Sequence, residues 1–331
     1  MLQLKNLTIE SPLFLAPMAG LTHTVLRRLI MAYGGMGLLS TEMLAATKLP
    51  RENAEISPYL VRSAVETPLS YQLLVCRVED LGPAINALHG LRADAVDLNL
   101  GCPAPFVRRM GAGSKLMESP AKVRALVAEA RRLTSLPLTA KIRLGEDLDE
   151  AKLRDFCLML EGEGLDLLTV HARLRGEAFC RKPRWQWVGK VKEWLTIPVV
   201  ANGGIFSVDD ARKCLAESGA DGLMIGRAAA IKPWLFAEIA REVYGASIPA
   251  PEVRLPVLYL EFVRILIESF LPERQLGRLK EFTHYFAKNY AFGHQLASAV
   301  QPSHSVAEAR ERALAFFVRN DPDNVPVGVD D

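Results

Sequence analysis

The chain has 331 residues, half of them hydrophobic, a length typical of one large α/β domain with a smaller domain attached. The 40 Lys and Arg almost balance the 38 Asp and Glu, giving a net charge of +2, so only local basic clusters could indicate a polyanionic partner. The five cysteines are an odd number, widely spaced and without a Cys-x-x-Cys pair, which argues against a disulfide framework or a zinc site and indicates a reducing compartment.

Apolar strand-like runs alternate with helix-like segments over most of the chain. We predict eight strands, over residues 13–18, 37–43, 69–74, 93–100, 138–144, 167–173, 197–204 and 222–227. Helices are predicted between them, among others over residues 120–132, 150–163 and 208–218. Eight strands separated by helices, at about 30 residues per unit, predict an α/β fold of the (β/α)8 or TIM barrel type. A doubly wound open sheet is the alternative, which the lack of Gly-x-Gly-x-x-Gly after the first strand disfavours.

A thiol follows the fourth predicted strand, in the stretch Asp97-Leu-Asn-Leu-Gly-Cys-Pro103. Gly101 allows a sharp turn and Pro103 prevents the strand from continuing, so we expect Cys102 to project from a rigid rim. The alternative is a buried cysteine that acts as a small hydrophobic side chain.

Polar side chains stand within or at the end of seven predicted strands, where a purely structural role would favour Val or Leu. They are Glu42, Gln72, Asn99, Lys141, His171, Asn202 and Arg227. In barrels of this type the functional site lies at the carboxyl ends of the strands, so these residues predict a site there. Any one of them could be a structural polar residue at the barrel mouth, but a whole set is hard to explain that way.

Two glycine-containing turns follow the last two strands, Asn202-Gly203-Gly204 and Ile225-Gly226-Arg227-Ala228. Loops at these positions are the usual phosphate site of the barrel, because exposed backbone N–H groups and a helix start attract anions. A phosphate there, with amide and apolar residues over the other strand ends, suits a flavin mononucleotide. Ordinary tight turns are the alternative.

The composition changes after residue 245. We expect a barrel domain over residues 1–245, a linker over 246–256, a helical domain over 257–320 and an acidic flexible tail over 321–331. The helical domain is predicted to contain amphipathic helices over residues 257–270, 274–290 and 306–319.

Basic residues gather in the loops after the fourth and sixth strands. The first loop carries Arg108, Arg109 and Lys115 without an acidic residue; the second carries Arg173, Arg175, Arg181, Lys182 and Arg184 against Glu177 alone. Together with Arg278 and Lys280 these clusters fit contacts to a nucleic-acid backbone, with a solvated surface as the alternative. The nearby aromatic residues that could stack on exposed bases are Phe106, Phe179, Trp185 and Trp187, although the two tryptophans could equally pack their helix onto the barrel.

The amino terminus lacks the cationic-then-apolar order of a signal peptide, and no apolar run reaches membrane-spanning length. We therefore expect a soluble cytoplasmic protein that binds no membrane and no metal.

Short motifs along the whole barrel occur in a specific order. They are Ala16-Pro-Met-Ala-Gly20, Thr41-Glu-Met43, Gln72 in its strand, Asp97 to Pro103, Gly111-Ala-Gly113, Lys141-Ile-Arg-Leu-Gly145, Val170-His-Ala-Arg173, Val200 to Gly204, Met224 to Ala228 and, more weakly, Arg278-Leu-Lys280. In this order they resemble the tRNA-dihydrouridine synthases, flavin-dependent enzymes that reduce a uridine in tRNA. Two positions depart from the family pattern: Ala172 replaces a frequent glycine, and residues 177–184 lack the usual glycine.

The resemblance implies roles for individual residues. Those implied to bind FMN are Pro17, Met18 and Ala19 over the ring, Gln72 and Lys141 at its edge, His171 nearby, and Asn202, Gly203, Gly204, Gly226 and Arg227 at the phosphate. Those implied to contact the substrate or its RNA are Asn99 at the uracil, Arg143, Arg173, Arg108, Arg109, Arg278 and Lys280. Cys102 would be the catalytic proton donor, with NADPH or NADH as a transient electron donor and tRNA as the partner of a monomeric enzyme.

The implied reaction is chemically consistent with these residues. Reduction of the uracil C5=C6 bond needs a hydride at C6 and a proton at C5, and a thiol with a pKa of about 8.5 is mostly protonated at neutral pH. Two alternatives remain: a flavin-dependent barrel oxidoreductase for a free pyrimidine or enone, which the basic loops and helical domain disfavour, and a non-redox RNA-binding protein, which the flavin motifs disfavour.

Overall fold

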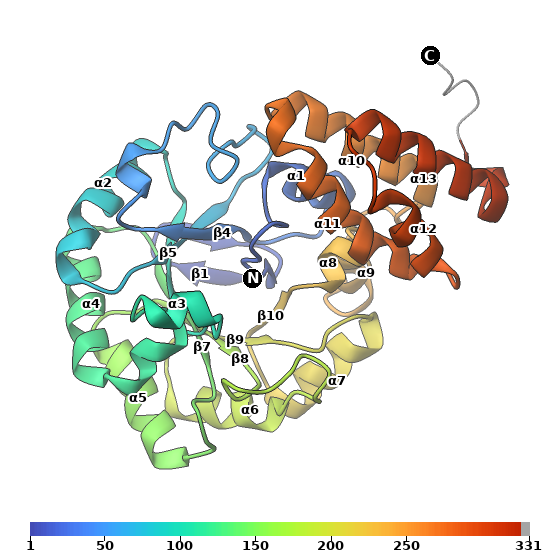
Figure 1. Cartoon of the computed structure of the whole chain (residues 1–331). Helices are drawn as coiled ribbons and strands as arrows, with labels where there is room; N and C mark the ends of the chain where they lie inside the picture. The colour runs from blue at the N-terminus through green and yellow to red at the C-terminus, as the bar shows by residue number, and fades with distance from the viewer. Residues whose placement is uncertain (326–331) are drawn as a thin grey trace.

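The computed structural model describes residues 1–325, and its central feature is a barrel of eight parallel strands (Figure 1). The strands are β3 (Leu13–Leu15), β4 (Leu39–Ala45), β5 (Leu69–Leu74), β6 (Ala95–Asn99), β7 (Leu138–Arg143), β8 (Leu167–His171), β9 (Val199–Asn202) and β10 (Gly222–Ile225). Every predicted strand is present, although most end a few residues earlier than predicted.

The ring of strands closes between the first and second strands of the barrel. β3 pairs with β10, and Leu15 N donates to Leu38 O at 3.0 Å while Leu38 N donates to Leu13 O at 3.1 Å. The strand order β3-β10-β9-β8-β7-β6-β5-β4 is therefore that of a TIM barrel, which confirms the predicted fold and excludes the doubly wound open sheet.

Helices surround the barrel, as expected for βα units whose apolar faces cover the sheet. They are α1 (Thr24–Tyr33), α2 (Leu81–Gly90), α4 (Pro120–Leu133), α5 (Glu150–Gly162), α6 (Trp185–Trp194), α7 (Val208–Ser218), α8 (Ala228–Ile231) and α9 (Leu235–Glu242), with the short α3 (Pro105–Arg109) above the β6 end. Two capping residues explain where α7 begins and ends. At its start the Ser207 side chain accepts the Asp210 N–H at 3.1 Å, and at its end Gly219 adopts a left-handed φ of 57°.

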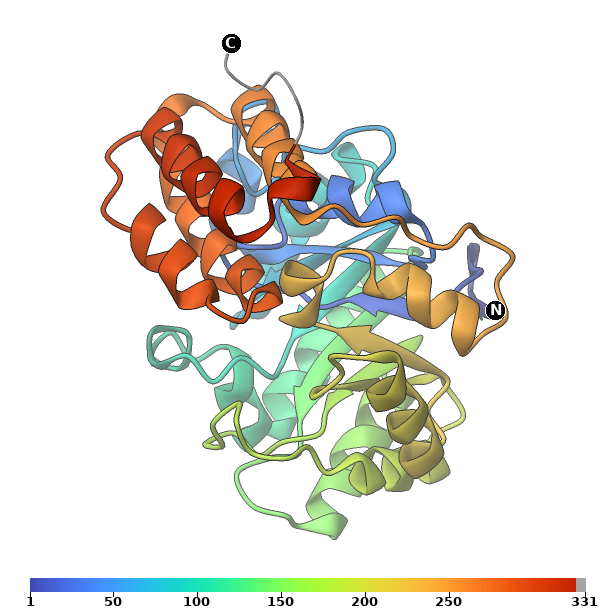
Figure 2. The ribbon, with the colours of Figure 1, turned by 90° about the vertical axis from the view of Figure 1, so that its right-hand side faces the viewer.

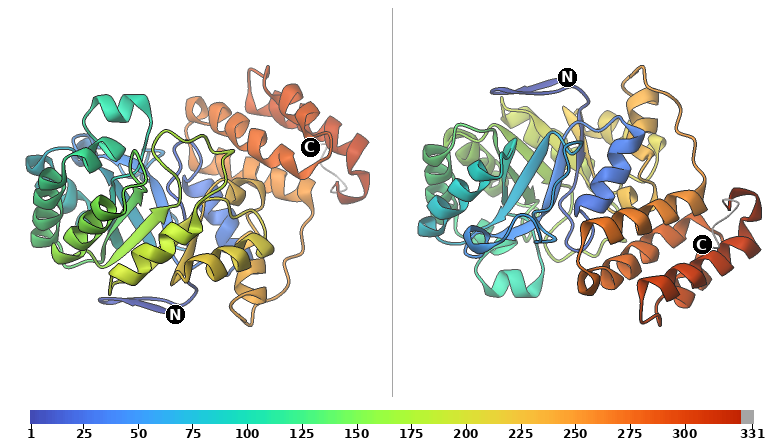
Figure 3. Two further views of the ribbon diagram at one scale, coloured as in Figure 1. Left: turned by 90° about the horizontal axis from the view of Figure 1, so that it is seen from below. Right: turned by 90° about the horizontal axis from the view of Figure 1, so that it is seen from above.

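A short hairpin at the amino terminus, β1 (Leu2–Leu4) and β2 (Leu7–Ile9), was not predicted. Leu4 and Ile9 are buried against Phe14 and Met224 inside the barrel, so the hairpin closes the amino-terminal end. It lies at the end of the barrel opposite α3 (Figure 3). The hairpin thus covers this end of the barrel, and the strands finish at the other end.

Four helices form a bundle on one side of the barrel (Figure 2). They are α10 (Leu255–Ser269), α11 (Leu276–Phe286), α12 (Gly293–Val300) and α13 (Val306–Asn320). The helix predicted over residues 274–290 is shorter than expected, and α12 was missed. An aromatic core holds the bundle together, with the rings of Phe262 and Phe282 stacked at 3.7 Å and Tyr259 hydrogen-bonded to Thr283 at 2.7 Å.

The bundle contacts the barrel through α10 against α1 and α11 against α8. Residues 243–254, between α9 and α10, form neither helix nor strand. Of the predicted tail, Asp321 accepts a hydrogen bond from the Tyr290 hydroxyl at 3.0 Å and residues 322–324 form a 3-10 turn, while residues 326–331 lie outside the described part of the chain. Within residues 1–325 no helix has the length and apolar character needed to span a bilayer.

Candidate functional site

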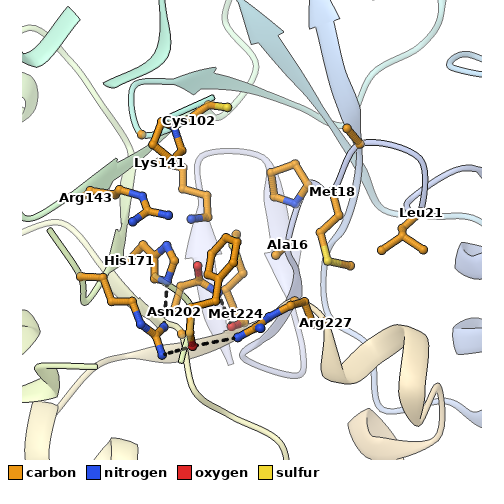
Figure 4. A pocket seen from close by; sticks show the side chains of 18 of the residues that line it. Ala16, Met18, Leu21, Cys102, Lys141, Arg143, His171, Asn202, Met224 and Arg227 are labelled. Atoms are coloured by element: carbon orange, nitrogen blue, oxygen red, sulfur yellow. Dashed lines mark hydrogen bonds between the residues drawn. The ribbon is translucent and has the colours of Figure 1, made fainter. Parts of the chain in front are cut away.

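A cavity of about 500 Å³ opens at the carboxyl ends of the barrel strands (Figure 4). Each strand contributes to its wall, either directly or through the residues that follow it. Of the seven polar strand-end residues predicted to share a site, six line this cavity: Gln72, Asn99, Lys141, His171, Asn202 and Arg227. These six side chains therefore meet at the strand ends, where the site was predicted. Of the seven residues, only Glu42 lies elsewhere.

The amide groups of Gln72 and Asn99 belong to one chain of hydrogen bonds across three strands. Asn99 Nδ2 donates to Gln72 Oε1 at 2.7 Å, and Gln72 Nε2 donates to Asp97 Oδ2 at 2.6 Å. Thr139 on β7 donates to the other Asp97 oxygen at 2.5 Å. Each amide nitrogen has two hydrogens, so this chain orients both amides and leaves each a second N–H for a ligand.

Asp97 and Thr139 were given no role from the sequence. Burial raises the pKa of Asp97, while the bonds from Thr139 and Gln72 and the charge of Lys141 oppose that shift. Asp97 is an ionisable residue inside a run that otherwise suits a buried strand. Because such residues are rarely buried without a partner, its position in the sequence could have indicated a role in the site.

Cys102 is partly buried at the rim of the cavity rather than in the core. Its backbone is held from both sides, because its N–H donates to Asn99 Oδ1 at 2.9 Å and its carbonyl accepts from Ser114 N at 2.9 Å. A Cβ on Gly113 would fall 2.6 Å from that carbonyl oxygen, so only glycine allows the loop this close. The thiol therefore stands on a rigid support.

Cations form one side of the cavity. Desolvation, with the neighbouring charge of Arg143, lowers the pKa of Lys141 to about 7. Burial also lowers the pKa of His171 far below its usual value, helped by the positive charges of Lys141 and Arg143. His171 is therefore neutral. Arg173 Nη1 lies 3.1 Å from His171 Nε2 and can only donate, so Nε2 is the acceptor. The proton of the neutral ring is then on Nδ1.

Two arginines predicted to contact RNA are built into the cavity wall. Arg143 and Arg173 are each only 3% exposed. Arg143 donates to Leu174 O at 2.8 Å, and Arg173 donates through Nε to Arg181 O at 2.9 Å. Both line the cavity, where their guanidinium groups can reach a ligand, whereas a phosphate backbone on the surface lies outside their reach. Their assignment to the substrate or its RNA stays a prediction.

Phe179 lies over the cationic side of the cavity. Its ring is stacked on His171 with centroids 6.1 Å apart, and Arg227 Cζ lies 4.6 Å from its centroid. Its carbonyl oxygen accepts from Arg173 at 3.2 Å and from Arg227 at 3.4 Å. Phe179 and Phe106 are both exposed and line the cavity, and stacking of either ring on a base stays a prediction.

The predicted phosphate turns line the wall next to this cationic side. Gly203 has a φ of 108°, and a Cβ there would fall 2.7 Å from His171 Cδ2, so no other residue fits. Asn202 Nδ2 donates to Met224 O at 2.7 Å, and Trp185 Nε1 donates to Gly203 O at 2.9 Å. Trp185 is buried and hydrogen-bonded to this turn, so it supports the turn from behind, as the packing alternative predicts.

The basic loops are more neutral than the sequence suggested. Glu118, which was not counted with the loop after β6, pairs with Arg108 at 3.4 Å, Lys115 at 2.5 Å and Arg175 at 2.6 Å. Arg184 pairs with Glu177 at 2.5 Å, which lowers the pKa of Glu177 to about 2. The exposed cations at this mouth include Arg109, Arg181 and Lys182.

A second cavity, of about 860 Å³, separates the β4 side of the barrel from α11. It shares Ala19, Met43 and Phe106 with the first cavity, so the two are neighbours with these residues at their boundary. Glu42 and Arg278 line it, whereas Lys280 lines neither cavity. Tyr285 of α11 reaches the first cavity, a contribution of the helical bundle that the sequence did not reveal.

Comparison with known proteins identifies the family. The family model described as dihydrouridine synthase matches residues 14–313. The chain is 33% identical to a probable tRNA-dihydrouridine synthase 1 from Synechocystis sp., over 94% of this chain and 87% of that protein. It is 34% identical to a tRNA-dihydrouridine(16) synthase from Pseudomonas putida, over 83% and 88% of the two chains.

Solved structures with low sequence identity share the barrel. An old yellow enzyme homologue from Zymomonas mobilis has a TM-score of 0.54 at 11% identity, covering 76% of this chain and 94% of that one. A morphinone reductase mutant has a TM-score of 0.51 at 15% identity, covering 76% and 91%. These likenesses concern the fold alone, whereas the family match spans barrel and bundle together, and on that ground the chain belongs to the dihydrouridine synthase family.

Proposed function

We propose that this protein reduces a specific uridine of tRNA to 5,6-dihydrouridine, with bound FMN, NADPH as electron donor and Cys102 as proton donor. The observation that carries the proposal is the meeting of Cys102, the Gln72–Asn99 amide pair and Lys141 around one cavity. That cavity also opens toward the helical bundle, which leaves room for a macromolecular substrate.

The cavity fits a flavin in size and in chemistry. Its volume of about 500 Å³ lies within the usual range for cofactor sites. Pro17, Met18 and Ala19 would cover the ring, while Gln72 and Lys141 would hold its polar edge and His171 would donate from Nδ1. The phosphate would lie at Asn202, Gly203 and Gly204 with Gly226 and Arg227, where glycine turns and a cation favour an anion. Arg173, beside His171, adds a further charge.

When bound, FMN would supply the hydride for uracil C6, and residues of this chain would position the ring edge and the base. Lys141 has a pKa of about 7, so it can become fully charged when negative charge lies at the adjacent ring edge. The free N–H of Asn99 would bind a uracil carbonyl and orient the base.

Cys102 would deliver the proton to uracil C5 from the rim. The Asn99 and Ser114 hydrogen bonds to its backbone fix the position from which the thiol acts. The thiol would then regain its proton from solvent, to which it is partly exposed. The target base must leave its stack to reach this point, because the cavity lies below the rim.

The RNA would lie across the mouth and the bundle. We assign surface contacts to Arg108, Arg109 and Lys280, an RNA contact in the second cavity to Arg278, and contacts with ligands inside the first cavity to Arg143 and Arg173. Phosphate contacts of this kind position the RNA without reading its sequence.

The test compares Cys102→Ala with Cys180→Ala, which removes an exposed thiol elsewhere in the active-site loops. We expect Cys102→Ala to lower dihydrouridine formation by at least about a hundredfold, the scale of general acid catalysis, with flavin content and flavin reduction by NADPH unchanged. Mass spectrometry of unmodified tRNA before and after reaction detects the two-dalton gain per reduced uridine. Full activity of Cys102→Ala would refute its role, and reduction of free uracil as fast as tRNA would refute the substrate.

A further inference from the structure

Glu42 is the polar strand-end residue that the first cavity does not use. Its side chain is only 3% exposed, on the floor of the second cavity. Gly20 N donates to Oε2 at 2.7 Å, but Oε1 is buried without a hydrogen-bond partner within the described residues. A buried carboxylate oxygen without a donor is unfavourable, so it marks a place that a ligand would complete.

We propose that the second cavity is a subsite for the unpaired base next to the target uridine, and that Glu42 Oε1 accepts a hydrogen bond from an exocyclic amino group of that base. This inference rests on the proposed function, since it requires a uridine in the first cavity. It adds a determinant of which uridine is chosen.

The adjacency of the cavities supports a continuous strand rather than two separate ligands. Ala19, Met43 and Phe106 line both cavities, so the two lie side by side with these residues at their common boundary. A nucleotide chain that places one base in the first cavity therefore directs a neighbour toward the second.

The rim of the second cavity offers a platform for an unstacked base. Tyr59, Phe106 and Met110 are 40%, 53% and 49% exposed along it. Aromatic and apolar surfaces of this kind stack on bases in single-stranded RNA.

The charges of the cavity favour a base with donor groups over a bare phosphate. Arg278 faces Glu42 from α11, donates to Arg274 O at 2.8 Å and lies 5.0 Å from the Phe270 ring, while its buried Nε has no partner within residues 1–325. The cations Lys48 and Arg274 are offset by the acidic residues Glu52, Glu273 and Glu281.

The chemistry of Glu42 selects among bases. Burial raises the pKa of Glu42 above its usual value, and the Gly20 N–H and the charge of Arg278 offset only part of that shift. The Gly20 N–H donates to Oε2, which therefore acts as an acceptor, and the proposal concerns the carboxylate form. A carboxylate only accepts, so it matches the amino groups of adenine, cytosine or guanine. Uracil has no exocyclic amino group. Its ring N–H lies between two carbonyl oxygens, and a carboxylate repels those oxygens.

The experiment measures dihydrouridine formation on tRNA transcripts in which each neighbour of the reduced uridine is changed in turn to all four bases. For the wild type, we expect an amino-bearing neighbour on one side to support a rate about tenfold higher than uridine there, the scale of a hydrogen bond to a charged group. In Glu42→Gln, the new amide can keep its oxygen on Gly20 and turn its nitrogen to the cavity. We expect that donor to abolish or reverse the preference.

Glu55→Gln makes the same change at an exposed residue that lines neither cavity, and should keep the wild-type ranking. The proposal is overturned if the wild type is indifferent to both neighbours, or if Glu42→Gln slows every transcript equally and keeps the ranking. If Glu42→Gln does not fold, the wild-type series can still overturn the proposal, because indifference to both neighbouring bases would exclude a base-selective subsite. Absence of dihydrouridine from every wild-type transcript would instead refute the proposed function.

Discussion

The side-chain oxygen of Asn99 accepts the backbone N–H of Cys102 at 2.9 Å, while the nitrogen of the same amide donates to Gln72 at 2.7 Å. One side chain thus connects the support of the thiol with the amide pair on the cavity floor. Positioning of the proposed acid and binding of the proposed substrate therefore depend on the same residue.

Substitution of Asn99 should separate these two effects. Asn99→Ala leaves the Cys102 N–H and Gln72 Oε1 without partners, and we expect kcat/KM for tRNA to fall by about a hundredfold or more, combining two lost hydrogen bonds at a catalytic site. Asn99→Asp keeps the acceptor for Cys102 but sets a second oxygen against Gln72 Oε1, so it should also lose activity, by less than Asn99→Ala if support of the thiol dominates. Equal activities would show that the Cys102 bond has no catalytic consequence. Steady-state rates with flavin content measured in parallel provide the comparison.

Gly203→Ala should abolish flavin binding. The added Cβ would fall 2.7 Å from His171 and 2.9 Å from Arg173 Nη1, at a φ of 108° that other residues rarely adopt. The matched control is Gly82→Ala, where a Cβ meets nothing within 4 Å in helix α2. Absorbance of the bound flavin and thermal unfolding check both variants. Normal flavin content in Gly203→Ala would contradict the assigned phosphate site.

Lys141 should make the stability of the flavin-free protein depend on pH. Its pKa is about 7 when folded against 10.5 in the unfolded chain, so between these values the unfolded state holds a proton that the folded state lacks. The free energy of unfolding should therefore rise with pH in that window, by up to about 1.4 kcal/mol per pH unit.

Urea unfolding of wild type and Lys141→Met at pH 7, 8 and 9 measures this contribution as the difference between the two proteins. The difference should change with pH because only the wild type carries the titrating group. Parallel curves would mean that Lys141 stays charged throughout.

Trp185→Phe should weaken flavin binding and stability, because it removes the indole N–H from Gly203 O and leaves a buried carbonyl unsatisfied, at a cost of about 1–3 kcal/mol. Trp187→Phe, in the same helix, changes a partly exposed ring that lies 4.7 Å from Lys190 and should have little effect. Flavin titration and thermal unfolding distinguish the two. A raised KM for tRNA with unchanged flavin affinity in Trp185→Phe would instead favour base stacking.

Much of the barrel follows from local sequence. Short apolar runs bounded by glycine and proline predicted every barrel strand, since a strand covered on both faces must be apolar throughout. The same logic singled out Lys141 and His171, because a polar residue in such a run needs a reason. The amino-terminal hairpin was missed because its strands are three residues each, too short for a periodic pattern. Helix α12 was missed between longer helices for a similar reason.

Local sequence also limited what could be said of individual charges. Arg173 and Arg108 look alike as loop arginines, yet one is buried against its own loop and the other pairs with Glu118. The partners of Arg173 lie six and eight residues along the chain and Glu118 lies ten residues from Arg108, so burial and pairing depend on how each loop folds back on itself and not on the neighbouring residues alone.

The sequence by itself determined that polar side chains stand at the strand ends and that a thiol follows the fourth strand, because strand periodicity and the glycine and proline after β6 act within a few residues. Only the tertiary structure decided which of these side chains share a cavity. It placed Glu42 in the second cavity, opposite Arg278 of the helical bundle. It also placed the Phe179 ring on His171, on the cationic side of the first cavity. Such contacts are set by barrel closure and by the packing of α10 and α11 on the barrel, which bring together residues separated by most of the chain.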